Sequence, residues 1–352
     1  MLYRAMGEIA DVVDLGPHPN RVVDFALHAA GARRDPTEGN VSLWHNLVVT
    51  DRWLQRAVTQ RLRADPVDSV LLVRDMLRLP VPTAAYRDVV FDQLTELLDG
   101  GQPFHLVGHP GFTRELFERR RDRDNELLVN LDAIIVFSQW SAAYLRDRLG
   151  IAAQRVHVVA PGVRSLAPPD THHVEARQDR RRSRLLFVGA DFRRKGGAEL
   201  LAAFTHLRRR CPDATLTIIG PSRWPLDTSP PDGVEFLGRC APDAVAEAFQ
   251  THDLFVMPSH FEPYGISFIE ALSHGLPCVA RDTCAMPEIL GHGEMGVLAS
   301  DTTPNALAQT IEAALGDDAL YSRVADAIAT TRSNATWQRA ASELLVILRS
   351  IA

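Results

Sequence analysis

The sequence lacks an apolar run long enough to cross a membrane. Its 352 residues are 46% hydrophobic, but no stretch approaches the ~20 consecutive apolar residues that a spanning helix needs. The N-terminus also lacks the succession of charged, apolar and small residues that marks a secretory signal peptide. We therefore expect a globular, cytoplasmic protein, and its length favours two domains over one.

Cysteine is scarce, and neither sign of charge is in large excess. The four cysteines contain no C-x-x-C pair, which disfavours a zinc site, and their small number disfavours a disulfide scaffold. The net charge of −6 and the pI of about 6.1 indicate no general attraction to nucleic acid or to anionic membranes. No nucleic-acid partner and no metal are expected.

Short β-branched runs recur along the chain, and a helical pattern follows each of them. Continuous apolar runs that alternate with helices predict parallel sheets covered on both faces. The expected fold is α/β, with two Rossmann-like domains that face each other across a ligand cleft. The predicted strands are 11–16, 41–49, 68–75, 104–109, 133–138 and 155–162 in the first half, and 184–189, 215–220, 234–238, 253–259 and 277–281 in the second.

A polar, proline-bearing segment at 166–183 predicts a linker between the two halves. It separates an N-terminal domain, 1–165, from a C-terminal domain, 184–330. Apolar residues at helical spacing in 331–352 predict a closing amphipathic helix that packs against the core.

Two charged stretches each allow two interpretations. The arginine run of the linker is either a phosphate or membrane patch or a solvated face, and we favour the solvated face. The stretch 112–128 has basic residues beside apolar ones and allows peripheral membrane contact, but its interleaved acids favour a solvent-facing helix. The same helix contains Asp122-Arg123-Asp124, formally a D-x-D metal motif, which we interpret as part of the solvated face.

Two acids lie in an otherwise apolar stretch, EPYGISFIEALSHGLP, at 262–277. A helix is predicted to begin near Gly265 and to end at Gly275, and the N–H groups and dipole at its start suit a phosphate. Glu270 lies one turn further in, where a carboxylate needs partners or a shifted pKa. The paired hydroxyls of a ribose are suitable donors to it. The alternatives are that Glu270 pairs with an arginine and that Glu262 is an ordinary exposed loop acid.

A second anion-binding pattern occurs in RLLFVGADFRRKGG, where a strand, a cationic loop and a helix follow one another. Arg194 and Lys195 stand just before Gly196-Gly197, where the backbone can turn sharply into the helix. Arginine can donate two hydrogen bonds to phosphate oxygens, and lysine can act beside it as a point charge. The alternative is an exposed basic loop without a partner. Two such poles in one cleft match a diphosphate better than a monophosphate.

Several segments in the same order resemble the retaining glycosyltransferases of the GT-B fold, family 4 (glycosyl transferases group 1). They are PSHFEPYGISFIEALSHGLPCVA with its Glu-x(7)-Glu pair, FVGADFRRKGG, VEFLGRCAPDAVAEAFQTHDLFVMPS, MPEILGHGEMGVL and DAIIVFSQWSAAYLRDRLGIAAQRVHVVAPGV. The resemblance implies that Glu270 holds the ribose of a nucleotide-sugar and that Glu262 contacts the transferred sugar. It gives Lys195, with Arg194 near it, the diphosphate and the charge of the leaving group.

The resemblance also implies roles for two backbone segments and a histidine. The backbone at Gly265 and Ile266 would help to bind the donor, and the segment around Gly238 would lie against the nucleobase. A histidine that follows a strand of the first domain would reach the donor sugar. His109 is the better match for it and His105 the weaker one, and for His109 an exposed or helix-capping histidine is an equal alternative.

The implied reaction moves a hexose from a nucleotide-diphosphate-sugar to an acceptor with retention of configuration, without a metal or a cofactor. His109, Glu262 and Lys195 are the implied catalytic residues. Two features depart from the family pattern: no glycine-rich loop follows a first strand, and Ala190 stands where an arginine is expected, so that Arg193 or Arg194 would substitute. A degenerate scaffold that binds a nucleotide-sugar or a partner enzyme, an epimerase and a phosphorylase are the alternatives, and no segment marks the pyridoxal lysine that such a phosphorylase needs. Base, sugar, acceptor and oligomeric state are left open.

Overall fold

The second half of the chain forms a six-stranded parallel sheet. Its order is β12-β11-β10-β7-β8-β9, and every neighbouring pair is parallel. This is the doubly wound order of dinucleotide-binding domains, in which ligands bind beyond the strand ends where the order reverses. Here the reversal lies between β7 and β10. The strands are β7 (Arg184–Val188), β8 (Thr215–Ile219), β9 (Val234–Gly238), β10 (Leu254–Met257), β11 (Cys278–Arg281) and β12 (Gly296–Ala299).

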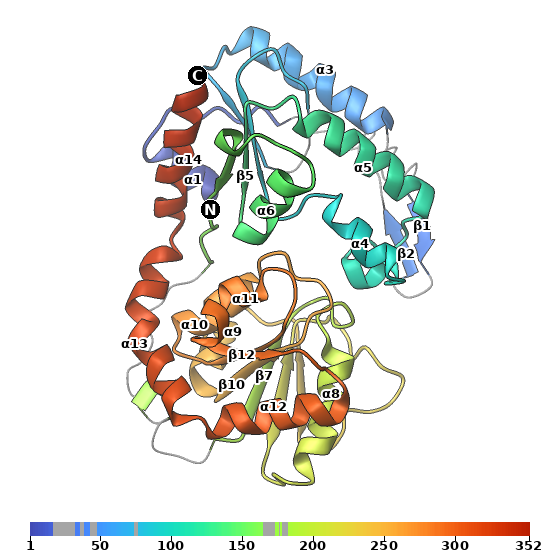
Figure 1. Cartoon of the computed structure of the whole chain (residues 1–352), viewed down its shortest axis with the longest axis vertical. Coiled ribbons are helices and arrows are strands. Elements are labelled where there is room, and N and C mark those ends of the chain that lie inside the picture. The colour runs from blue at the N-terminus through green and yellow to red at the C-terminus, as the bar shows by residue number, and fades with distance from the viewer. Residues whose placement is uncertain are drawn as a thin grey trace. The chain divides into compact units, whose positions relative to one another are not determined.

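Figure 1 draws the computed structural model, which describes residues 1–16, 32–35, 39–42, 48–73, 77–164, 173–175, 177 and 182–352. The chain divides into two compact units. The first comprises Met1–Ala160 together with Trp337–Ala352, and the second comprises Pro161–Thr336. The C-terminal helix thus returns to the unit in which the chain begins.

Helices cover both faces of the sheet in the second unit (Figure 1). The central strand β10 is wholly buried, with the apolar sequence Leu-Phe-Val-Met. Helices α8 and α12 pack against each other, as do α10 and α9, and α10 also packs against α13. The helices are α8 (Gly197–Arg208), α9 (Pro242–Thr251), α10 (Ile266–Ser273), α11 (Met286–Ile289), α12 (Pro304–Gly316) and α13 (Asp318–Asn334).

The first unit contains a four-stranded parallel sheet of order β3-β4-β5-β6. Helix α14 brings Ala340, Leu344 and Leu348 into the core of this unit and packs against α1. A separate antiparallel hairpin consists of β1 and β2. The elements are α1 (Leu2–Gly7), β1 (Ala32–Asp35), β2 (Gly39–Ser42), α3 (Val48–Ala64), β3 (Val70–Leu72), β4 (Thr83–Arg87), α4 (Gln93–Asp99), η2 (Phe104–Val107), α5 (Arg114–Leu128), β5 (Ala133–Val136), α6 (Gln139–Asp147), η3 (Ala153–Arg155), β6 (Val156–Val158) and α14 (Trp337–Ile351).

The predicted strands of the second half are all confirmed, and β12 was missed. In the first half, β3, β5 and β6 confirm three predictions, but 11–16 carries no strand and 104–109 forms the 3-10 helix η2. The prediction for 41–49 is confirmed at Val41 and Ser42, which belong to β2, and is wrong from Val48, where α3 begins. Residues 43–47 lie outside the described residues. Strand β4 was missed because its Thr-Ala-Ala-Tyr-Arg sequence has no β-branched run, although all five residues are buried.

Helix α5 is not the fully solvated helix that its charges predicted. Asp122 is exposed, but Asp124 is buried and accepts two hydrogen bonds of 2.7 Å from Nη1 of the equally buried Arg87. Arg120 and Asp51 form a second buried ion pair at 3.6 Å. The buried acid and base of α5, Asp124 and Arg120, therefore pair with residues far away in the sequence, which alternation of charge along the helix cannot reveal.

The arginine run of the predicted linker is likewise not only a solvated face. Most of 166–183 lies outside the described residues, but Arg177 is 1% exposed and Arg182 packs its guanidinium over the ring of Tyr321 at 3.7 Å. No helix among the described residues is long and apolar enough to cross a membrane. All four cysteines are free thiols.

Candidate functional site

The first part of the site is the loop between β7 and α8, residues 189–196, which we call the lysine loop. It ends at Gly196, whose φ of +75° places it in the left-handed region at the N-cap of α8. Glycine adopts this conformation without a steric penalty. The stem of Lys195 crosses Gly189 so closely that a Cβ at 189 would lie 2.3 Å from its Cδ. These two glycines let the loop turn sharply and place the lysine side chain over the end of β7.

The second part is the loop between β10 and α10, residues 258–265, which we call the glutamate loop. Gly265, at φ +76°, is the N-cap of α10 and has no side-chain capping bond. A Cβ there would lie 2.8 Å from Phe268, so only glycine fits without rearrangement. Ile266 at the first helical position is 40% exposed. The predicted helix start is confirmed, and Gly275 at φ +66° just beyond its end confirms the predicted stop.

The two loops meet because β7 and β10 are neighbouring parallel strands. Nζ of Lys195 lies 3.4 Å from Oε2 of Glu262, whose side chain is only 10% exposed. This oxygen has no hydrogen-bond partner among the described residues, although it is within ion-pair distance of Lys195. A cation and a carboxylate predicted to act on the same substrate therefore lie in contact beyond the strand ends.

The guanidinium of Arg194 forms hydrogen bonds with other groups of the protein. Its Nε donates to Asp191 Oδ2 at 2.8 Å and its Nη1 to the carbonyl of Phe261 at 2.6 Å, and Nη1 lies 3.7 Å from Oε2 of Glu262. Arg193 beside it is exposed. The donor-binding role of Arg194 stays a prediction, and the contacts of Arg194 show that it also joins the two loops.

Lys195 is the only lysine in the chain; the other basic residues among the 38 are all arginines. Arginine therefore serves at every exposed and buried basic position except this one. An ammonium group is a compact point charge, whereas a guanidinium is a broad planar fork. The single lysine stands where a strand end, a helix start and a buried carboxylate converge.

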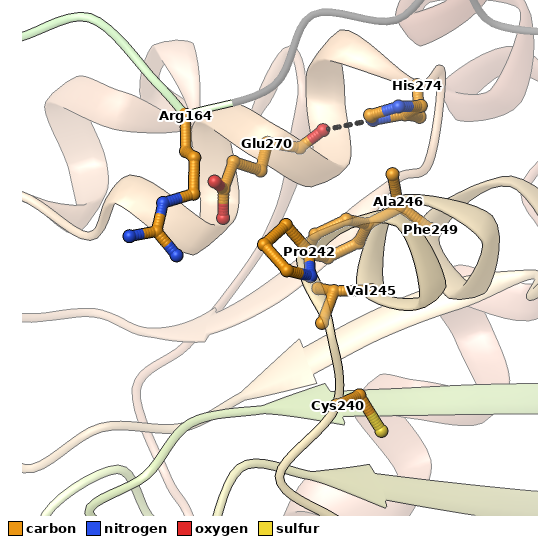
Figure 2. A pocket seen from close by; sticks show the side chains of 8 residues that line it. All are labelled: Arg164, Cys240, Pro242, Val245, Ala246, Phe249, Glu270 and His274. Carbon is orange, nitrogen blue, oxygen red and sulfur yellow. Dashed lines mark hydrogen bonds between the residues drawn. The ribbon is translucent and has the colours of Figure 1, made fainter. Parts of the chain in front are cut away.

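Beside these loops, α9 and α10 enclose a cavity of about 180 Å³. Glu270 lines this cavity, and Figure 2 shows the carboxylate of Glu270 next to the guanidinium of Arg164. Burial raises the pKa of Glu270, which a backbone hydrogen bond from Arg164 and the charges of Lys195 and Arg164 oppose. The lining residues are Arg164, Cys240, Pro242, Val245, Ala246, Phe249, Glu270 and His274.

The cavity has an apolar side and a polar side. Pro242, Val245, Ala246 and Phe249 of α9 form an apolar side, suited to the flat face of a ring. Opposite them, the carboxyl group of Glu270 is an acceptor for hydroxyl groups. A ring with an attached diol fits this combination.

His274 closes the cavity at the end of α10. It is 1% exposed, its Nδ1 lies 2.8 Å from the carbonyl oxygen of Glu270, and its ring stacks on Phe249 at 5.9 Å (Figure 2). Burial lowers its pKa, so the ring is neutral at neutral pH. Nδ1 then carries the proton that it donates to the carbonyl. The histidine thereby ties the end of α10 to α9.

The remaining predicted residues lie in two places. Gly238, at φ +67°, ends β9 and accepts a hydrogen bond of 2.8 Å from the N–H of Gly220; Cys240, two residues on, lines the cavity. His109 belongs to the first unit, after η2, with its ring 5.0 Å from the rings of Phe91 and Phe112. Its catalytic role, and the weaker alternative of His105, stay predictions.

Sequence reasoning placed both loops and Glu270 but missed the α9 wall of the cavity. The only signal was that Cys240 and Pro242 directly follow the segment assigned to a nucleobase. It also missed Arg164, whose place beside Glu270 depends on a contact more than a hundred residues apart in the chain. Among the described residues, no group of three or more potential metal ligands lies close together.

Comparison with known families gives a match over most of the second unit. Residues 170–330 match the model of the family described as glycosyl transferases group 1. This part of the chain is similar to that family. The matched region contains the lysine loop, the glutamate loop and α10, so the similarity covers most of the site.

The chain is also similar to individual glycosyltransferases. It is 26% identical over 247 residues to the D-inositol 3-phosphate glycosyltransferase of Corynebacterium efficiens. The aligned region covers 64% of this chain and 58% of that protein. The chain thus spans less than two thirds of the length of this relative.

Solved structures show the same fold. Sucrose-phosphate synthase from Thermosynechococcus elongatus superposes with a TM-score of 0.68 at 18% identity, over 98% of this chain and 96% of that one. Anabaena Alr3699/HepE in complex with UDP-glucose superposes with a TM-score of 0.61 at 18% identity, over 84% and 82%. The predicted GT-B fold, with two parallel α/β sheets, is confirmed.

Proposed function

We propose that this protein is a retaining, metal-independent hexosyltransferase that uses a nucleotide-diphosphate-sugar donor. The observation that carries the proposal is the contact between the only lysine and the buried Glu262 at the start of α10, next to a cavity that contains Glu270. The match of residues 170–330 to the glycosyl transferases group 1 family supports glycosyl transfer, and the geometry supports a donor with three parts.

Each part of such a donor has a matching group. The cavity accepts a nucleobase against the apolar residues of α9, and Glu270 accepts hydrogen bonds from the ribose hydroxyls. The diphosphate would lie across Lys195 and the exposed N–H groups at the start of α10. Glu262, already beside Lys195, would then turn to the hydroxyls of the sugar. Lys195 acts on Glu262 by contact and on Glu270 by its charge, so one cation serves the whole length of the donor.

The proposed reaction replaces one bond at the anomeric carbon with another on the same face. The bond from C1 of the sugar to the phosphate oxygen breaks, and the acceptor hydroxyl oxygen bonds to C1. The acceptor proton passes to the leaving phosphate oxygen, so that a nucleoside diphosphate is released. Lys195 and the α10 N-terminus stabilise the negative charge that grows on that phosphate. This cationic neutralisation is the part that a metal ion supplies in other transferases.

The first test is donor binding. Wild type and Glu270→Ala would be heated with UDP, GDP, ADP or TDP, and Glu247→Ala, an exposed glutamate of the neighbouring α9, would be the matched control. A cognate nucleotide at 100 times its Kd stabilises the fold by about 2.7 kcal/mol. We expect this gain in wild type and Glu247→Ala and its loss in Glu270→Ala. UDP is the first choice, because Anabaena Alr3699/HepE was solved with UDP-glucose.

The second test is turnover of the matching nucleotide-sugar, measured as release of the nucleoside diphosphate with and without an acceptor. Lys195→Ala should lower kcat/KM about 10²- to 10³-fold, as for removal of other groups that stabilise a growing charge. Lys195→Arg should not restore it, because a planar guanidinium does not fit the narrow path over Gly189. Binding without any turnover would point instead to a degenerate scaffold, and full activity of Lys195→Ala would refute the assignment.

A further inference from the structure

Besides the ion pairs of Lys195 and Arg194 with Glu262, three further contacts join the lysine loop and the glutamate loop. The N–H of His260 donates to the carbonyl of Arg194 at 2.8 Å, and Arg194 in turn donates to the carbonyl of Phe261 at 2.6 Å. Gly196 passes so near to Pro258 that a Cβ on it would lie 2.2 Å from that carbonyl oxygen. The two loops therefore touch along their length, and a shift in one must move the other.

A further contact joins the glutamate loop to helix α8. Nε2 of His260 lies 2.6 Å from Oε1 of Glu199, in the first turn of α8. Both side chains are mostly covered, with 15% and 28% exposed. Neither lines the cavity, and neither contacts Lys195 or Glu262 directly by a hydrogen bond or ion pair among the described residues.

The charge state of Glu199 is well defined. Burial raises its pKa, but the hydrogen bond with His260, a hydrogen bond with its own backbone, and the charges of His260 and Arg281 together lower it below the ordinary value. Glu199 is therefore a carboxylate at neutral pH. A carboxylate in the first turn of a helix is also stabilised by the helix dipole, so α8 holds this acceptor in place for His260.

We propose that Glu199 and His260 are positioning residues that set the distance between Lys195 and Glu262; the inference rests on the proposed function. Glu199 lies four residues after Lys195, and His260 lies two residues before Glu262. The bond between them fixes the α8 side of one loop to the start of the other, so the lysine and the glutamate are held by the same connection.

The consequence for catalysis follows from where the contact lies. In the proposed function, binding of the nucleoside part of the donor depends on the cavity and Glu270, which the Glu199–His260 contact does not reach. Transfer depends on Lys195 and Glu262 being placed correctly at the leaving group and the sugar. A displacement of about 1 Å can cost 10²-fold in rate. Loss of the contact should therefore lower kcat and leave the Kd of the free nucleoside, which lacks the diphosphate, nearly unchanged.

Two pairs of variants separate this role from general support of the fold. Glu199→Met and His260→Leu keep the volume and remove the hydrogen bond, whereas Glu199→Gln and His260→Gln keep a partner for it. We expect a fall of about 10- to 100-fold in kcat for the first pair, with less than a twofold change in the Kd of uridine, and near wild-type kcat for the second. Equal losses of kcat and uridine affinity, or no loss in the first pair, would overturn the proposal.

A measurement that needs no turnover tests the positioning role separately from the proposed function. Because Lys195 is the only lysine, protein grown with lysine labelled at ¹³Cε gives one lysine side-chain signal in an NMR spectrum. That signal should move or split in Glu199→Met and His260→Leu and stay in place in the glutamine variants. If wild type shows no turnover of any donor, the proposed function fails, while an unmoved lysine signal in all four variants overturns the positioning role by itself.

Discussion

Arg177 offers a sharp test of how the cavity is held together. All five N–H groups of its guanidinium donate to backbone carbonyls. Nε donates to His252 at 2.6 Å, Nη1 to His274 at 3.0 Å and Gly275 at 2.9 Å, and Nη2 to Phe249 at 2.6 Å and Gln250 at 2.5 Å.

These carbonyls belong to the ends of the two helices that form the cavity. Residues 249–252 end α9, and residues 274–275 follow α10. Carbonyls at helix ends have no partner within their helix and carry the negative end of the dipole. One buried cation thus satisfies both helix ends and fixes their spacing.

Arg177→Lys keeps the charge but reduces the donors from five to three. At least two buried carbonyls then lose their partner, and each such loss costs about 1–3 kcal/mol. We expect the free energy of unfolding to fall by about 2–6 kcal/mol. For a unit of this size, 1 kcal/mol corresponds to about 2–4 °C, so the melting temperature of the second unit should fall by about 4–24 °C.

The assay is urea and thermal unfolding of the full chain, followed by circular dichroism. Arg210→Lys is the matched control, because Arg210 makes one half-exposed ion pair with Glu312 and such pairs contribute about 1 kcal/mol or less. Nucleotide-dependent stabilisation should also shrink in Arg177→Lys, since the cavity walls lose their common support. Equal stability of the two variants would refute the reasoning.

Two further predictions concern residues that lower the stability of the folded protein, Glu270 by its charge and Cys284 by its backbone conformation. Because burial raises the pKa of Glu270 above its ordinary 4.5, the folded state favours the neutral acid, and wild-type stability falls as the pH rises from about 4.5 through the folded pKa. Glu270→Gln should therefore equal wild type in urea midpoint near pH 4.5 and exceed it at pH 7.5; a difference independent of pH would contradict this. Cys284 has a φ of +52°, a left-handed conformation that costs a residue with a Cβ about 1–2 kcal/mol. Cys284→Gly should be more stable than Cys284→Ala by about that amount in urea unfolding, and equal stabilities would show that the conformation carries no strain.

Patterns within one segment could be predicted from the sequence. The apolar runs of β7, β8 and β10, the glycines at both helix starts and Gly275 at the end of α10 act over a few neighbours, so they were visible in the chain itself. Strand β4 could not be predicted, because its sequence Thr-Ala-Ala-Tyr-Arg has no β-branched run, and its burial depends on the neighbouring strands.

Partners far apart in the sequence could not be predicted. The charges of Asp124 and Arg177 look like those of any exposed segment, and only the folded chain brings Arg87 to one and five carbonyls to the other. The cavity shows the same limit. The motif around Glu270 indicated a ribose site, but which face of α9 lines it depends on how α9 packs against α10.

The single lysine has a practical consequence for following the opening of this site. A protease specific for lysine can cut the chain at one peptide bond only, between Lys195 and Gly196, where Gly196 is buried. The folded loop cannot enter a protease active site, so cleavage must wait until the loop detaches from its surroundings. The rate at which the intact chain becomes two fragments, 1–195 and 196–352, therefore counts openings of one loop, and a donor bound across Lys195 should slow it.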